Sequence, residues 1–208
     1  MKKLLILLFS LFLLNSSSVF ADDISDFEIE GISIGDSLLD YMTEDEILKE
    51  IERTKDIYYY LNEPYKYSEV YLYEDFPTYK DGLSFLVKNN HTSQYINNIN
   101  DKFTIVSIRG MIDYIEDFDG CIAKKDEIVE ELSMVFPNAE KTLINFAHPA
   151  DPSGNSVIDG AYFYFDLGGK SEVSCVNFEE TFRIKKTWSE GLDVAIDTEE
   201  IVKWLEDW

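Results

Sequence analysis

A pair of adjacent glycines in the last third of the chain constrains the fold most. Gly168 and Gly169 lie between two strand-like runs, residues 157–167 and 172–178. Two-residue glycine turns connect antiparallel strands, because glycine adopts the positive φ angles that such turns require. The two runs are therefore predicted to form a β-hairpin.

Most other patterned segments also resemble strands. We expect them at residues 26–34, 70–73, 83–88, 102–114, 142–146, 182–187 and 192–196, with the last two paired to each other. An Asn-rich loop at residues 89–101 is expected to join the strands 83–88 and 102–114 as a hairpin. Apolar stripes at helical spacing predict helices at 44–55 and 124–136, and a final helix capped by Asp197. Because strands follow strands, we expect an α+β fold with a largely antiparallel sheet and about three helices.

The first 21 residues have the composition of a secretion signal. Two lysines precede an apolar run at residues 4–14, and a polar stretch then leads to Ala21, where we expect cleavage. This run is shorter than the roughly 20 residues that a membrane-spanning helix needs, although an uncleaved anchor remains the alternative. We expect an exported protein, periplasmic or extracellular, that is soluble after cleavage.

Residues 22–208 are long enough for one globular domain. Because Lys2 and Lys3 lie in the signal segment, residues 22–208 carry 16 basic and 41 acidic residues. This charge disfavours nucleic acid and anionic lipid as partners; it is compatible with cationic partners or with a role in solubility alone. The two cysteines of the chain, Cys121 and Cys175, predict one disulfide bond in an exported protein.

The start of this domain contains a short motif of a known enzyme family. Residues 34–38 read Ile-Gly-Asp-Ser-Leu, which resembles the GDSL block of the SGNH esterases and lipases. The resemblance implies a parallel sheet, Ser37 as the nucleophile and a histidine as its base, here His148. The family places that histidine three residues after an aspartate, whereas Asn145 stands at this position. A serine esterase is therefore the alternative function.

A longer string, GISIGDSLLDYMTEDEI at residues 31–47, resembles the start of small exported proteins of unknown function from marine bacteria. This resemblance implies no activity.

A tyrosine-rich stretch is the best candidate for binding. Tyrosine combines an apolar ring with a polar hydroxyl, which suits contacts with sugars or peptides, although tyrosines also cover half-buried sheet faces. The candidate surface consists of Tyr58, Tyr60, Tyr65, Tyr67, Tyr71, Tyr73 and Tyr79.

The segment 151–156 has the oxygen-rich composition of a calcium loop. An EF-hand requires a glutamate at the twelfth position, where Tyr162 stands, so we expect an ordinary turn. The sequence thus predicts a non-enzymatic binding or envelope-associated domain, without cofactor or metal. Its partner would be a protein, a peptide or a sugar.

Overall fold

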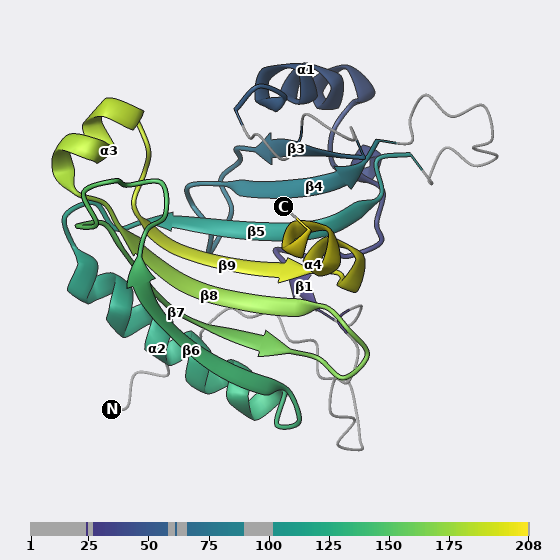
Figure 1. The fold of residues 1–208 in the computed structure, drawn as a ribbon. Coiled ribbons are helices and arrows are strands. Elements are labelled where there is room, and N and C mark those ends of the chain that lie inside the picture. The colour runs from purple at the N-terminus through teal and green to yellow at the C-terminus, as the bar shows by residue number, and fades with distance from the viewer. Residues whose placement is uncertain (1–23, 25–26, 58–60, 62–65, 90–101, 208) are drawn as a thin grey trace, which may run out of the picture.

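The centre of the fold is a seven-stranded sheet in the order β3-β4-β5-β9-β8-β7-β6 (Figure 1). A computed structural model describes residues 24, 27–57, 61, 66–89 and 102–207 of the chain. All neighbouring strands are antiparallel, which confirms the predicted α+β class and contradicts the parallel sheet implied by the GDSL motif. The strands are β3 (Tyr67–Leu72), β4 (Leu83–Lys88), β5 (Ile105–Asp113), β6 (Glu140–Ala147), β7 (Val157–Tyr164), β8 (Lys170–Asn177) and β9 (Gly191–Asp197).

The described residues also form four α-helices, one 3-10 helix and a small two-stranded sheet. In chain order these are β1 (Glu28–Ile29), β2 (Ile32–Ser33), the 3-10 helix Leu38–Asp40, α1 (Glu44–Thr54), α2 (Phe118–Val135), α3 (Glu180–Lys186) and α4 (Glu199–Glu206). In Figure 1, α2 lies behind the large sheet and α4 lies in front of it. We call these two sides of the sheet the α2 face and the α4 face.

The main hydrophobic core fills the α2 face. Successive strand side chains alternate between faces, so every second residue points toward α2. On the central strand β9 these residues are Leu192, Val194 and Ile196, all at most 1% exposed. A smaller cluster on the α4 face holds Ile201 and Trp204 of α4 against the sheet.

Helix α1 lies along the outer edge of β3 (Figure 1). The predicted capping box is present, with Thr43 and Glu46 each bonded to the backbone of the other. At the end of the helix the Thr54 hydroxyl donates to the carbonyl of Glu69 in β3 at 2.6 Å. This contact occupies a carbonyl group on β3.

The structure corrects the prediction for residues 182–187. They lie in and just after α3, and β9 pairs with β5 and β8 instead. The carboxylate of Glu179 accepts a hydrogen bond from the Phe182 N–H at 2.7 Å and begins the helix, and Thr187 ends it in a left-handed conformation. No residue of α3 is buried, so its apolar residues carry no core-facing periodicity that distinguishes helix from strand.

Two helix starts also differ from the prediction. Helix α2 begins at Phe118, earlier than expected, because Asp117 caps it by accepting from the Gly120 N–H at 3.1 Å. Helix α4 begins after Thr198 rather than at the predicted cap Asp197. The Asp197 carboxylate is turned into the sheet instead, where it accepts from the Ser107 hydroxyl at 2.6 Å.

Candidate functional site: the α4 face of the sheet

Two of the predicted surface tyrosines are buried. The ring of Tyr67 packs edge-on against Trp204, with ring centroids 4.8 Å apart. The ring of Tyr79 lies against Gly110, where an added Cβ would come within 2.4 Å of it. Tyr67 and Tyr79 therefore belong to the core, and their inclusion in a contact surface was wrong.

The remaining tyrosines of that stretch are divided. Tyr71 is half-buried and Tyr73 is 65% exposed, and their rings stack at 5.8 Å. Arg53 of α1 lies over the Tyr71 ring at 5.2 Å. Tyr58, Tyr60 and Tyr65 lie outside the described residues. A tyrosine contact surface stays a prediction, restricted in the described part to the edge of the sheet at β3.

The structure separates Ser37 from His148. Ser37 is buried and its hydroxyl donates to the carbonyl of Lys102 at 2.8 Å, next to the start of β5. His148 follows the last residue of β6, and the strand register places that end opposite to the start of β5. Strands of eight residues separate these ends by roughly 25 Å. His148 therefore cannot act as the base for Ser37, and His91 lies outside the described residues.

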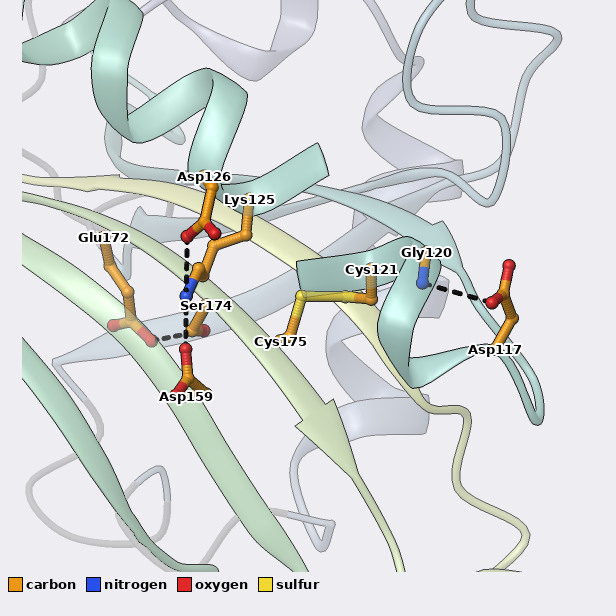
Figure 2. The surroundings of a disulfide bond; sticks show 9 residues. All are labelled: Asp117, Gly120, Cys121, Lys125, Asp126, Asp159, Glu172, Ser174 and Cys175. Carbon is orange, nitrogen blue, oxygen red and sulfur yellow. Dashed lines mark hydrogen bonds and ion pairs between the residues drawn. A yellow bond between two sulfur atoms is a disulfide. The ribbon is translucent and has the colours of Figure 1, made fainter. Parts of the chain in front are cut away.

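The predicted disulfide bond between Cys121 and Cys175 is present and joins α2 to β8 (Figure 2). Both residues are fully buried and their Cα atoms are 6.0 Å apart. One turn further along α2, the ammonium group of Lys125 lies between the carboxylates of Asp126 and Asp159 (Figure 2). These contacts hold α2 against the sheet, so the α2 face is closed.

The oxygen-rich loop at residues 151–156 has the hydrogen bonds of a turn. The Asp151 carboxylate accepts from the backbone and hydroxyl groups of Ser153 and Ser156, at distances of 2.7 to 3.0 Å. The Ser156 hydroxyl bond, the largest of these effects, holds the pKa of Asp151 well below its usual value. The carboxylate thus serves to close its own loop.

The α4 face has a different character, because charged and aromatic side chains cross its middle. The register places one residue of each strand in a single row, which we call the charged row: Tyr71, Ser84, Arg109, Ala195, Glu172, Tyr162 and Thr142. These residues come from segments as far apart as β3 and β9. The pairing of the strands, rather than closeness in sequence, therefore builds the row.

Ion pairs connect the charged row to the rows beside it. Arg109 lies 3.3 Å from the carboxylate of Asp193. Lys170 lies 3.5 Å from Glu172 and 3.6 Å from Asp197, and its ammonium group sits 4.4 Å above the ring centre of Tyr162. The side chain of Arg109 is 38% exposed, that of Asp193 24% and that of Glu172 13%. The network is thus partly open to solvent.

The electrostatic balance of this network shifts three pKa values. Burial acts to raise the pKa of Glu172, but the charges of Arg109 and Lys170 outweigh it and the pKa is lowered. Burial raises the pKa of Asp193, and Glu172 raises it further, against the attraction of Arg109. Burial, followed by the charge of Glu172, raises the pKa of Tyr162 to about 12. At neutral pH the row therefore holds an ionised Glu172 and a protonated tyrosine hydroxyl.

Apolar side chains occupy the same face between the charged row and the end of the sheet near α3. They lie in the two adjacent register rows and are Met111, Ile144, Phe146, Ile158 and Val176, which we call the apolar strip. Phe146 is 42% exposed and the others are half-buried. Gly160 and Ser174 lie in the same register row as Ile144, and both are buried.

This arrangement combines two kinds of contact on one surface. The apolar strip can remove a hydrocarbon group from water, at a gain of about 25 cal/mol per Å² buried. The charged row offers donors from Arg109 and an acceptor from Glu172, and Asp193 in the adjacent row adds a second carboxylate. A ligand with an apolar part and a hydrogen-bonding part would satisfy both.

Sequence reasoning missed this face, although a signal exists. Ionisable residues separated by an even number of positions inside a strand mark one side of it, as Lys170 and Glu172 do in β8 and Asp193 and Asp197 do in β9. That pattern identifies a polar face on each strand. It does not show which strands are neighbours, so the row itself was not predictable.

Comparisons with protein-family models, with curated proteins and with solved structures find no match for this chain. Among the described helices, none is both long and apolar enough to cross a membrane. The described residues also contain no cluster of three or more histidine, cysteine or acidic side chains that could hold a metal ion.

Proposed function

We propose that the protein is an exported, non-enzymatic binding domain that holds an amphipathic ligand on the α4 face. The observation that carries this proposal is the position of the apolar strip beside the charged row, on a face whose middle no described helix covers (Figure 1). Export rests on the N-terminal sequence and on the disulfide bond, which suits an oxidising compartment.

The geometry sets the orientation of the ligand. Its apolar part would lie over Ile144 and Ile158, near the end of the sheet at α3. Its polar part would meet Tyr162 and the carboxylate of Glu172. The hydroxyl groups of a sugar or the backbone of a peptide suit this second position, because the row contains both donors and acceptors.

Nile red, a neutral dye that fluoresces in apolar surroundings, tests the apolar half of the site. We compare Ile144→Asp with Leu143→Asp, because these neighbours in β6 point to opposite faces and Leu143 is the more exposed, at 73%. The wild-type protein should bind the dye. Ile144→Asp should weaken binding about tenfold, the loss expected for one aliphatic contact, whereas Leu143→Asp should bind as the wild type does.

Both variants must retain the unfolding transition of the wild type for the comparison to count. Absence of dye binding by the wild-type protein would sink the proposal. Equal loss in both variants would also contradict it, because the dye would then respond to exposed apolar residues in general rather than to the α4 face.

A further inference from the structure

Helix α3 exposes apolar side chains that the fold itself does not use. It interrupts the connection between β8 and β9, and Figure 1 shows it beyond the strand ends, on the side away from α2. None of its seven residues is buried. Ile184 is 62% exposed and the nearby Trp188 is 37% exposed. Exposed apolar groups gathered at one projection indicate a contact surface.

The same projection concentrates positive charge on a strongly acidic protein. The chain has 18 basic and 41 acidic residues, yet Arg183, Lys185 and Lys186 fall within four consecutive positions. Among the described residues, no ion pair joins Lys185 or Lys186 to a carboxylate, whereas Lys55, for example, pairs with Glu52 on its own helix. These two lysines are therefore available to an anionic partner.

A cluster of rings gives the projection a fixed shape. Trp188 lies 5.4 Å from Phe178 and 5.5 Å from Phe182, and the His148 ring lies 4.9 Å from Phe178, all between ring centroids. The Lys186 ammonium group lies 5.5 Å from the centre of the Trp188 ring. The rings support the tryptophan from one side and leave part of it in solvent.

Two acidic residues next to the helix, Glu179 and Glu190, are engaged at its base, whereas Asp113 and Glu116 beside them are exposed. Glu179 accepts from the Phe182 N–H, and Glu190 accepts from the N–H groups of Glu116 and Phe178 while lying 3.8 Å from Arg183. Glu180 is exposed, but it lies in the first turn, at the opposite end of α3 from the two lysines.

We infer that α3 docks the protein on the surface of an anionic lipid bilayer. Lys185 and Lys186 would contact the lipid phosphates, and Ile184 and Trp188 would enter the boundary between head groups and acyl chains. Lysine beside exposed tryptophan and aliphatic groups is the composition that binds at this boundary. The inference does not depend on the ligand of the α4 face.

The acidity of the rest of the protein fixes the orientation of docking. An anionic surface repels the acidic body and attracts the basic residues of α3, which favours approach by the end that carries this helix. At physiological ionic strength the Debye length is about 8 Å, which confines the repulsion to groups close to the lipid. The net negative charge of the chain disfavours contact with anionic lipid, and the basic residues of α3 are a local exception to it.

Vesicle binding tests the inference with a matched pair of variants. The chain from Asp22 to Trp208 is used, because it contains every described residue and lacks the N-terminal apolar run, which would bind vesicles itself. It should sediment with vesicles of equal parts phosphatidylglycerol and phosphatidylcholine, and not with phosphatidylcholine alone. Each lysine is expected to contribute about fivefold to partitioning, so Lys185→Gln with Lys186→Gln should reduce it about 25-fold.

The control removes the same charge elsewhere. Lys49→Gln with Lys80→Gln alters two exposed lysines outside α3 and should partition as the wild type does. Brominated lipid should quench tryptophan fluorescence in the wild-type chain, and Trp188→Phe should abolish that quenching. Equal binding to neutral vesicles, equal loss in both lysine pairs, or sedimentation without quenching would each overturn the inference; the last would show that the chain contacts the lipid head groups without inserting Trp188.

Discussion

Arg109 is the residue on which the electrostatics of the charged row depend. It forms an ion pair with Asp193 at 3.3 Å and contributes the largest attraction that lowers the pKa of Glu172. The folded protein favours the ionised form of Glu172, because the folded pKa of this residue is lower than its unfolded pKa. Glu172 therefore stabilises the fold at pH values above its unfolded pKa, and this stabilisation is lost as the pH falls through the folded pKa. Replacing the arginine removes the largest attraction that opposes the burial of Glu172.

Arg109→Met should destabilise the protein by about 1–2 kcal/mol at pH 7, less than for a fully buried ion pair because Arg109 is 38% exposed. Without the arginine, the pKa of Asp193, which burial already raises, should rise further, and the burial of Glu172 is opposed mainly by Lys170. The penalty should therefore shrink as the pH falls toward about 4.5, where carboxylates become protonated. Urea unfolding at both pH values measures the change.

The exposed pair of Arg53 with Glu50 provides the control for this prediction. Arg53→Met should change stability by less than about 0.5 kcal/mol at either pH, because a surface pair contributes little. A loss for Arg109→Met that is the same at both pH values would show that the arginine acts through packing alone.

At the scale of elements, the sequence predicted those parts whose signals are local. The hairpin around Gly168 and Gly169 and the capped helix α1 formed as expected, because a turn and a capping box each lie within a few residues. The segment 182–187 was mispredicted because the helix there is set by Glu179 and by a ring cluster that includes His148, far away in the chain. Local pattern cannot reveal such a distant contact.

The disulfide bond is the element-scale feature with the largest expected energy. It closes a loop of 54 residues, which corresponds to about 4 kcal/mol in the chain-entropy treatment. Changing Cys121 and Cys175 together to alanine should lower the free energy of unfolding by this order, and reduced wild-type protein should behave like the double variant. A loss of less than about 1 kcal/mol in the free energy of unfolding would mean that Lys125 and the apolar contacts of α2 are enough to hold this helix against the sheet.

At the scale of the whole molecule, the fold class was predictable and the site was not. Antiparallel pairing follows from the succession of strands, but the neighbours of β9 are β5 and β8, and nothing local to residues 191–197 indicates β5. Arg109 and Asp193 meet only because of that pairing. The candidate site is therefore a property of strand order, and the tyrosine-rich stretch drew attention because its signal is local.

The two faces of the sheet have different roles in this account. The α2 face is closed by the helix, the disulfide bond and the main core. The α4 face keeps a partly exposed ion network beside half-buried apolar residues, an arrangement that stability alone does not favour. We propose that this second face binds an amphipathic ligand.

Methyl chemical shifts during a titration with octyl glucoside, kept below its micelle concentration, report whether the α4 face binds such a ligand. The detergent combines an apolar chain with a neutral sugar, as the apolar strip and charged row require. We predict saturable shift changes at Met111, Ile144, Ile158 and Val176, with none at Leu143 or at Met134, which is 66% exposed on α2. Shift changes that favour Leu143 and Met134, or no saturable change at all, would contradict the account.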